Sequence, residues 1–504
     1  MKNSPYSIVA LKRSAVYFLT GKAISALLTL IIILWLVRLL ALEEYGVYVV
    51  LLSGMELVLA ITSFGLPWVA ARYLPEFRLH ANGKMLTHFV WGILAWGCLF
   101  LLVGVLVLLF SLPVLLPMEF LQYNDVVRFY LLVLLVEGLG RYVRENLLGP
   151  LLLQEQAQIS LVMRNLALLL LLAILATQDI VHLHQLVLIE LLASILGFIV
   201  AMRGLIRYLQ VHYDLPGRVE WQPPNRLEMK KIAYHTYFSH LVALTYSPQA
   251  FVFLVQHHLG FEAVALFGFL RNLYEQIARI LPAKLLFSLI QPKLVASFVG
   301  SGGMVELTRN ANLIGKMGLF VLMPVLVFTW TVGDEFLNLF SGGKFNQTGY
   351  YLAGFFLALI PLSQRQILVT VVVVSGKSNL VLFGASLGMM VLPLAYWLLE
   401  AGQYGMWSPI IAIIMGQMIF NITLSTTLVC TTNYRPDVIG FFKLIAMAIA
   451  EFILIQQFVI LVHDWFDLLI MAALVFVIFL LMAYFVKPFR KEELMKLKLL
   501  VNRK

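Results

Sequence analysis

The stretch LLVLLVEGLGRYVRENLLGPLLL, residues 131–153, decides the class of fold to which this chain belongs. Most of it is apolar, and it is as long as the roughly 20 residues with which a helix crosses the hydrocarbon core of a bilayer. It nevertheless contains Glu137, Arg141, Arg144 and Glu145. Charged side chains inside a membrane are costly and usually face the interior of a helix bundle or a water-filled cavity. The stretch therefore predicts a membrane protein with several helices around a polar interior.

The composition of the whole chain supports this prediction. Of its 504 residues 61% are hydrophobic and only 12% are charged, and the mean hydropathy is +0.92. Only helices or closed barrels satisfy the backbone in lipid, and the apolar runs are longer than the strands of a barrel. We predict an all-α polytopic membrane protein with fourteen spans, at about 14–39, 46–70, 87–112, 126–149, 157–177, 183–207, 232–256, 263–287, 312–333, 349–373, 379–400, 405–429, 438–461 and 467–486.

The loops between these spans differ in charge. Of the Lys and Arg residues in loops and tails, 23 fall on one side of the membrane and two, Arg38 and Lys344, on the other. Cytoplasmic loops carry such an excess, so both termini are expected in the cytoplasm. The same bias and the anionic lipid of the inner face account for the net charge of +10. No nucleic-acid partner is needed to explain it.

The segment 208–231 is one of the two longest predicted cytoplasmic loops, and its Pro-Gly and Pro-Pro pairs indicate a connector between two halves. We predict an N-terminal lobe over 1–207 and a C-terminal lobe over 232–429, followed by two further spans within 430–486. The basic tail 487–504 is either a short helix on the inner membrane face or a disordered segment.

The two halves share weak internal similarity, which is typical of transporters. Three landmarks recur at offsets of 218 to 222 residues: Lys12-Arg13 with Lys230-Lys231, Gly46 with Gly268, and Arg144 with Arg365. Because each half has an even number of spans, both have the same orientation in the membrane. The pattern predicts two pseudo-symmetric six-helix lobes plus two extra C-terminal helices, with the site between the lobes.

Charged residues within the spans are the candidates for that site. Two stripes have the i, i+4, i+8 spacing of one helix face, namely Glu137, Arg141 and Glu145, and Arg271, Glu275 and Arg279. Further charges in spans are Lys22, Glu56, Arg164, Glu190, Lys316 and Arg365. In the predicted topology seven basic residues lie in the middle or cytoplasmic part of the bilayer, namely Lys22, Arg141, Arg144, Arg164, Arg279, Lys316 and Arg365. A cavity there would be cationic towards the cytoplasm.

Each of these charges also has a structural explanation. Lys22 and Lys316 are close enough to the inner face to extend their ammonium groups to water. The two stripes are also explained as ion pairs within one helix that hold the bundle together. Arg144, Arg164 and Arg365 have no acid three or four residues away, so each needs a partner from another helix or from a ligand. Arginine suits phosphate because its planar fork holds two oxygens at once.

The opening segments GKAISALLTLIIILWLVRLLALEEYGVYVV and GLPWVAARYLPE, and later GDEFLNLFSGGKFNQTGYYLAG and VVVVSGKSNL, resemble a known family. The chain is similar over its full length to Wzx-like O-antigen and exopolysaccharide flippases. These polysaccharide biosynthesis proteins belong to the multidrug/oligosaccharidyl-lipid/polysaccharide exporter superfamily. The resemblance implies two six-helix lobes around a central cavity with two helices appended. It also implies an inner-membrane protein that moves an undecaprenyl-diphosphate-linked oligosaccharide to the outer leaflet, alongside other polysaccharide assembly proteins.

The resulting hypothesis is a lipid-linked oligosaccharide flippase that works by alternating access and is not an enzyme. The residues assigned to the substrate diphosphate are Arg141, Arg144, Arg164, Arg271, Arg279, Arg365 and Lys22. Glu56, Glu137 or Glu275 is the candidate for coupling to a proton or sodium ion, and no resident cofactor or metal is predicted. Two alternatives stay open: a cation-coupled multidrug exporter of the same superfamily, and a membrane enzyme such as a polysaccharide polymerase or ligase.

Overall fold

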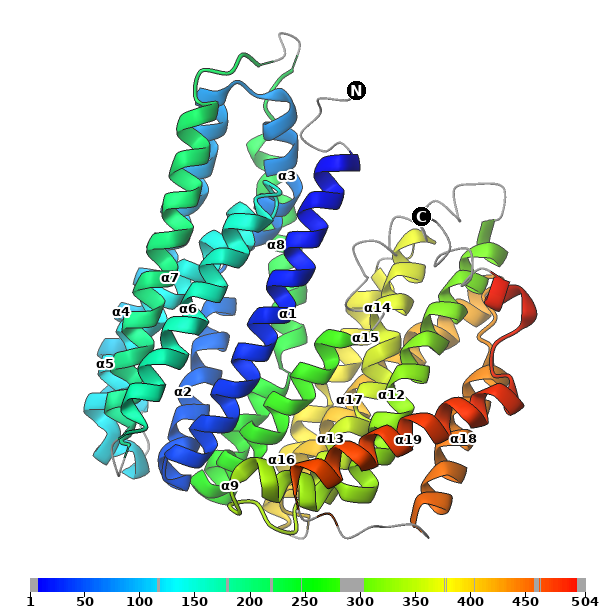
Figure 1. The fold of residues 1–504 in the computed structure, drawn as a ribbon. Helices are drawn as coiled ribbons and strands as arrows, with labels where there is room; N and C mark the ends of the chain where they lie inside the picture. Colours follow the sequence, from blue (N-terminus) through cyan, green and yellow to red (C-terminus); the bar gives the residue numbers. More distant parts are fainter. Residues whose placement is uncertain are drawn as a thin grey trace. The chain divides into compact units, whose positions relative to one another are not determined.

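A computed structural model describes residues 8–115, 118–177, 181–217, 221–245, 247–281, 303–375, 377, 379–402, 404–456, 462 and 464–495. Every regular element within these residues is a helix (Figure 1). Several residues of the predicted cytoplasmic segments lie outside this part of the chain: Arg218, Lys293 and the last nine residues of the tail, 496–504.

The chain divides into two compact units, Met1–Leu244 and Thr245–Lys504. The helices of the first unit are α1 (Ile8–Leu39), α2 (Leu42–Ile61), α3 (Leu66–His80), α4 (Gly83–Leu115), η1 (Met118–Tyr123), α5 (Asn124–Arg141), η2 (Tyr142–Leu148), α6 (Gln154–Leu175), α7 (Leu183–His212) and α8 (Arg226–Leu244). Those of the second are α9 (Pro248–Ile280), α12 (Gly303–Ser341), α13 (Gly349–Leu357), α14 (Leu359–Val374), α15 (Asn379–Met389), α16 (Val391–Glu400), α17 (Trp407–Thr431), α18 (Val438–Gln456) and α19 (Trp465–Val486). The predicted domain limits stay a prediction, and the first unit includes α8 beyond the predicted connector.

Twelve segments of the described chain are long and apolar enough to cross a membrane, against fourteen predicted spans. The predicted span 126–149 is α5 followed by η2, and its charged side chains keep it outside the twelve. The predicted spans 232–256 and 263–287 correspond to one segment of 54 residues, Arg226–Arg279. At about 1.5 Å per residue it is about 80 Å long, enough to cross the roughly 30 Å hydrocarbon core twice. The predicted fold class, an all-α polytopic membrane protein, is confirmed.

The interruptions of this long segment differ from the prediction. The sequence predicts a break at about 257–262, but α8 ends at Leu244 and α9 begins at Pro248. A second interruption lies inside α9 at Gly260, whose φ is 79° and ψ is −177°. Residues that carry a side chain rarely adopt a positive φ. Glycine, which has none, allows the kink at that point.

One end of the first unit is basic. The backbone N–H of Gly83, at the start of α4, donates to the carbonyl of Leu215 beyond α7 at 2.9 Å. Lys84 and Arg78 lie over the rings of Tyr213 and Tyr208, at 5.8 and 5.4 Å. The loop after α3 therefore meets the end of α7, which places two groups of Lys and Arg residues together. The predicted orientation requires these two loops to lie on the same side.

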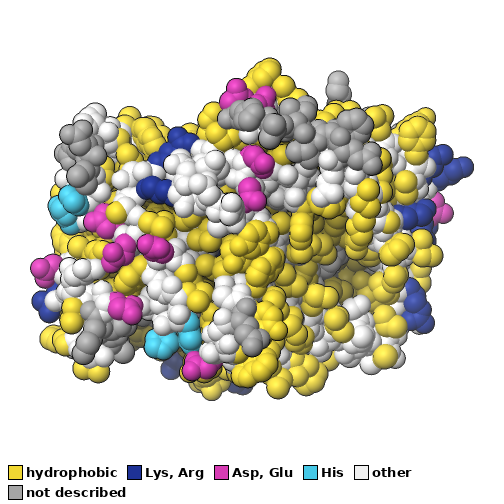
Figure 2. All heavy atoms as spheres, turned by 90° about the horizontal axis from the view of Figure 1, so that it is seen from below, with side chains coloured by type: hydrophobic (Ala, Val, Ile, Leu, Met, Phe, Trp, Pro, Cys, Tyr) yellow, Lys and Arg dark blue, Asp and Glu magenta, His cyan; other side chains and the backbone are white. Residues whose placement is uncertain are grey.

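The other end of the first unit is acidic. Gln122 of η1 donates to Glu43 of α2 at 2.8 Å, and His182 lies 3.6 Å from Glu44. Burial and the carboxylate of Glu43 raise the pKa of Tyr123 to about 12. Figure 2 shows acidic and histidine side chains in small groups among hydrophobic ones on the face seen from below. The two ends of the first unit therefore differ in charge, while their orientation in the membrane stays a prediction.

The apolar core of the first unit holds η2 in place. Its buried residues come from α3, α4, η2, the following turn, α6 and α7, and they include Tyr73, Val90, Leu147 and Leu205. η2 is a π-helix, in which the N–H of Gly149 donates to the carbonyl of Arg144 five residues earlier. Such wider turns are rare and often occur at functional sites.

In the second unit α12 is the helix against which α13, α14, α18 and α19 all pack. Near its start Lys316 is fully buried, and its ammonium group binds Asp437 at 2.8 Å and Glu493 at 2.6 Å. The prediction that Lys316 extends to water is therefore wrong, because two acids satisfy it inside the unit. Glu493 belongs to the described part of the basic tail, where 491–495 are helical and pack against α12.

Candidate functional site

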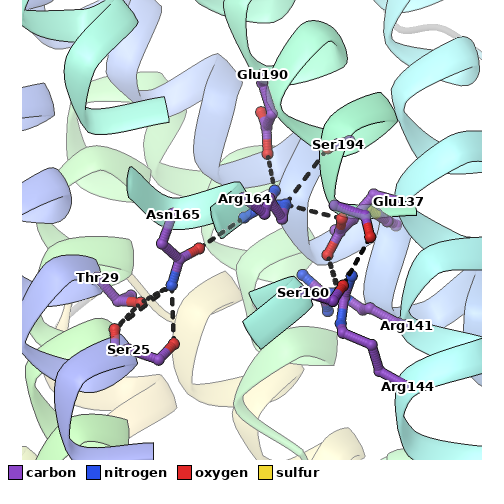
Figure 3. A network of polar contacts seen from close by, with 12 residues as sticks. Ser25, Thr29, Glu137, Arg141, Arg144, Ser160, Arg164, Asn165, Glu190 and Ser194 are labelled. Atoms are coloured by element: carbon purple, nitrogen blue, oxygen red, sulfur yellow. Dashed lines mark hydrogen bonds and ion pairs between the residues drawn. The ribbon is translucent and has the colours of Figure 1, made fainter. Parts of the chain in front are cut away.

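Glu137 of α5 is the centre of a buried network of charges (Figure 3). Its Oε1 atom lies 3.0 Å from Nε of Arg141 and 2.9 Å from Nη2 of Arg144. Its Oε2 atom lies 2.8 Å from Nε of Arg164 on α6. A single carboxylate thus binds three guanidinium groups, one each from α5, η2 and α6. Breaking such a buried arrangement is expected to be costly, since a remaining charge has lost its solvent.

Arg164 connects this carboxylate to two further helices. Its Nη2 atom lies 3.1 Å from Oε1 of Glu190 on α7, and its Nη1 atom donates to Asn165 at 3.2 Å. Asn165 in turn donates to the hydroxyls of Ser25 and Thr29 on α1 at 2.8 and 3.1 Å. The network therefore ties α1, α5, α6 and α7 together, and Figure 3 shows Arg164 between Glu137, Glu190 and Asn165.

Local helix geometry explains how these side chains meet. Glu137 and Arg141 are four residues apart and share a helix face, while Arg144 is seven residues, about two turns, from Glu137. The approach of α7 to α6 depends on Gly197, where an added Cβ would lie 2.9 Å from Cβ of Arg164. At the same crossing the hydroxyl of Ser160 donates to the carbonyl of Gly197 at 2.7 Å.

In the network three arginines form ion pairs with Glu137 and Glu190, and Arg141 also lies at a cavity that Glu56 and Glu145 line. Arg144 and Arg164 are enclosed, with side chains 5% and 10% exposed, whereas Arg141 is 32% exposed. The Nη1 atom of Arg144 is buried and has no hydrogen-bond acceptor among the described residues. A water molecule or a ligand oxygen would satisfy this donor.

Arg141 also lines a cavity of about 340 Å³ within the first unit. The walls come from α2, α3, α4, α5, η2 and α8, and the polar and aromatic lining residues include Glu56, Trp68, Tyr142, Glu145 and His240. The predicted coupling residue Glu56 therefore lies at the same cavity as the predicted substrate residue Arg141. The buried Oε2 atom of Glu56 has no hydrogen-bond donor among the described residues.

The second unit holds the other predicted site residues. In α9 Glu275 lies 3.8 Å from Arg271 and 3.7 Å from Arg279, and it also accepts from Gln249 at 3.4 Å. Arg271 is buried, and the side chain of Arg279 is 44% exposed. These contacts are longer than those around Glu137, so the two stripes share spacing but not geometry.

The remaining predicted residues lie apart from both stripes. Arg365 of α14 donates to Gln417 at 3.4 Å and lies over the ring of Phe420 at 4.5 Å. Lys22 of α1 is half-buried, with its ammonium group 4.9 Å from the centre of the Phe18 ring. The assignment of these residues and of both stripes to the substrate diphosphate stays a prediction.

Sequence analysis left several members of the first-unit site unassigned. Glu190 is named as a charge in a span but not as part of the site, and Asn165, Ser25 and Thr29 are not predicted at all. The signal for α1 is the i, i+4 spacing of Ser25 and Thr29 in an apolar helix. Asn165 directly follows Arg164, and two adjacent polar residues in a membrane span indicate a buried contact.

No protein-family model and no curated protein matches the sequence. The fold, however, is similar to solved structures of membrane transporters. The lipid II flippase MurJ in an inward closed conformation matches with a TM-score of 0.70 at 11% identity, over 94% of this chain and 99% of that chain. A multidrug resistance MATE family transporter matches in its inward-facing and outward-facing conformations with TM-scores of 0.56 at 14% identity. Those matches cover 81% and 82% of this chain and 96% and 93% of those chains.

At sequence identities of 11% and 14%, the similarity to these solved structures is evidence for the fold alone. The chain therefore has the fold of the flippase MurJ and of a MATE family transporter of the MOP superfamily. The all-α polytopic fold is confirmed, whereas the central cavity between two lobes and the narrower assignment to Wzx-like flippases stay predictions.

Proposed function

We propose that the chain is a flippase that moves an undecaprenyl-diphosphate-linked oligosaccharide from the inner to the outer leaflet of the cytoplasmic membrane. It works by alternating access and serves surface polysaccharide biosynthesis. The observation that carries this proposal is the group of three arginines around Glu137, which reaches the cavity of the first unit through Arg141. A diphosphate is the anion that such a group would attract from the membrane surface.

The two faces of the network have different roles in this proposal. Arg144 and Arg164 are enclosed and ion-paired, so they fix the position of Glu137. Arg141 shares Glu137 with them but is the most exposed of the three. An anion that enters the cavity meets the free edge of this guanidinium group first, because Nε is held by Glu137 and the terminal nitrogens can bind two oxygens.

The rest of the substrate fits a membrane protein with a polar interior. The sugar would occupy the wet cavity, where Glu56, Asn146 and His240 offer hydrogen bonds, and Trp68 offers a flat apolar surface. The polyprenyl tail would stay in lipid. The basic end of the first unit would face the cytoplasm, where lipid-linked precursors carry their headgroups before transfer.

A cation-coupled exporter is the second candidate, and one observation favours it. Two acids, Glu56 and Glu145, line the same cavity as Arg141, and a buried oxygen of Glu56 is unsatisfied among the described residues. An organic cation could bind between Glu56 and the aromatic ring of Trp68. The flippase and the exporter differ in which side chain is essential.

Purified protein in liposomes can separate the two functions. The first probe is a fluorescent short-chain polyprenyl-diphosphate disaccharide, whose transfer between leaflets is measured with a membrane-impermeant quencher. For the flippase, Arg141→Ala lowers the transfer rate by about tenfold or more, equivalent to about 1.4 kcal/mol. The control Arg128→Ala lies on the same helix, is exposed and keeps the wild-type rate.

The second probe is the cationic dye ethidium. Transport of ethidium that requires Glu56 and tolerates Arg141→Ala would establish the exporter and overturn the flippase. Wild-type transfer of the lipid-linked probe by Arg141→Ala, in a variant with unchanged thermal stability, would remove Arg141 from the substrate site.

A further inference from the structure

Glu451 of α18 lies on the buried face of the helix, where the other residues are glycine or apolar. The buried residues of this helix are Gly440, Leu444, Met447, Ala448, Glu451 and Ile455, which is the periodic stripe of a single face. Glu451 is 0% exposed. A carboxyl group therefore lies in the middle of the surface that α18 presents to its neighbours.

The helices packed against α18 are apolar at this level. They are α12 and α19. The inward face of α19 consists of Leu468, Met471, Val475 and Phe479, and one turn of α12 contributes Trp330, whose ring contacts that of Phe452 beside Glu451. Both carboxylate oxygens of Glu451 are enclosed, and neither has a hydrogen-bond partner among the described residues.

The titratable groups of these helices make no hydrogen bond with Glu451 among the described residues. On α18 itself Lys443 is eight residues earlier, about 12 Å along the axis. On α12 Lys316 lies next to Gly440, eleven residues or about 16 Å from Glu451, and is already bound by Asp437 and Glu493. The others are Glu306 and Arg309 near the start of α12, Asp334 and Glu335 four and five residues after Trp330, Asp467 in the first turn of α19, and Tyr484, which is 75% exposed.

Glu451 thus differs from the other fully buried glutamates. Glu137 contacts three guanidinium groups and Glu190 contacts one, whereas no cationic group of the described chain contacts Glu451. Burying an ionised carboxylate without a partner is strongly unfavourable, and a protonated carboxyl avoids that cost. We propose that Glu451 is a proton-binding site, which holds its proton while α18 is packed against α12 and α19 and releases it when water enters between them.

Proton release and separation of these helices are then a single event. If the helices part during transport, a proton gradient would drive one direction of the cycle. This use as a coupling site rests on the proposed function, whereas the proton site itself does not. Glu451 would be the coupling residue in place of Glu56, Glu137 or Glu275.

Infrared spectroscopy of the purified full-length protein tests the site without transport. A protonated carboxyl in apolar surroundings has a C=O stretch well separated from that of carboxylates. At neutral pH the wild-type protein should show this band, and E451Q, which has the shape of the neutral acid, should lose it. The control E262Q changes an exposed glutamate of α9 and should keep the band.

An identical band in wild type and E451Q would overturn the proposal. If E451Q does not fold, E451D serves instead, because the retained carboxyl should shift the band rather than remove it. An unshifted band in E451D would also overturn the proposal.

The liposome assay then tests coupling. An imposed pH gradient should change the transfer rate of the lipid-linked probe severalfold in wild type and in E262Q, and the dependence should be lost in E451Q. Gradient dependence that persists in E451Q removes Glu451 from coupling. A wild-type protein that has the infrared band but transfers no probe would contradict the proposed function and leave the proton site standing.

Discussion

The carboxylate of Glu137 on α5 lies 2.8 Å from the guanidinium group of Arg164 on α6, in the interior of the first unit. In this contact the carboxylate of α5 and the guanidinium group of α6 neutralise each other inside the unit. The same guanidinium continues to Glu190 on α7 and to Asn165, which binds α1. One network of charge-assisted contacts therefore holds four helices together. Substitutions in this network test how much it contributes to stability.

Glu137→Gln should lower the stability of the protein substantially. The amide cannot neutralise the three guanidinium groups around it, and removing one partner from a buried ion pair costs about 3–5 kcal/mol. We expect a clear drop in the thermal unfolding midpoint in detergent. Glu145→Gln is the control, because Glu145 lies on the same helix face but is exposed. Equal midpoints for both variants would show that the network contributes little to stability.

Arg164→Lys should also destabilise, although it conserves the charge. Arg164 directs three different nitrogens to Glu137, Glu190 and Asn165, and a single ammonium group cannot reproduce that fork. The expected loss is about 1.5–3 kcal/mol, the size of one hydrogen bond to a charged group. Arg128→Lys, at an exposed position of α5, should have no effect. Full stability of Arg164→Lys would mean that charge alone matters at this position.

Gly197→Ala and Gly92→Ala should have effects of opposite sign. At Gly197 the new Cβ would lie 2.9 Å from Cβ of Arg164, so α7 must move from α6 and weaken the contact of Arg164 with Glu190. At Gly92 of α4 nothing lies within 4 Å of the new Cβ, and alanine is favoured over glycine in a helix by up to about 1 kcal/mol. We expect a lower unfolding midpoint for the first variant and an unchanged or higher one for the second. A rise in both would show that α6 and α7 tolerate wider spacing.

Asp437 should make the second unit sensitive to acid. Burial alone would raise the pKa of this carboxyl, but the hydrogen bond and charge of Lys316 outweigh it and hold the pKa below its ordinary value of 3.8. The unfolded chain then takes up a proton at a higher pH than the folded chain does. This contribution is fully present above about pH 4 and is lost as the pH falls below it.

Unfolding midpoints measured across this acid range test the contribution of Asp437. Asp437→Asn should lower the midpoint at neutral pH and flatten its decline on the acid side. Asp214→Asn changes an exposed residue after α7 and should follow the wild type. An acid-side decline in Asp437→Asn as steep as in the wild type would assign the sensitivity to other groups.

Contacts within one helix could be predicted from spacing. Glu137 with Arg141, Arg271 with Glu275 and Glu275 with Arg279 are all ion pairs between residues four apart. The period of the α-helix fixes such neighbours whatever the rest of the chain does. The geometry still differs, since the pair in α5 is 3.0 Å apart and those in α9 are 3.8 and 3.7 Å apart.

Contacts between helices could not be predicted in the same way. The partners of Lys316 lie 121 and 177 residues further along the chain, and spacing carries no information about them. The predicted position of Lys316 near the inner face suggests a side chain that extends to water. In the structure its ammonium group instead binds Asp437 from the loop before α18 and Glu493 from the tail. Arg164 likewise has partners on α5 and α7, and Arg365 has Gln417 and the ring of Phe420.

The sequence by itself determined that this protein crosses the membrane with many helices, since the length and hydropathy of each run reflect the bilayer and not the neighbouring helices. It also determined which charged residues share a helix face. The tertiary structure alone decided which of those charges are satisfied, because a buried charge is stabilised by groups within a few ångströms in space. Glu137 and Glu451 are both glutamates in apolar helices, and only packing gives one three arginines and the other none among the described residues.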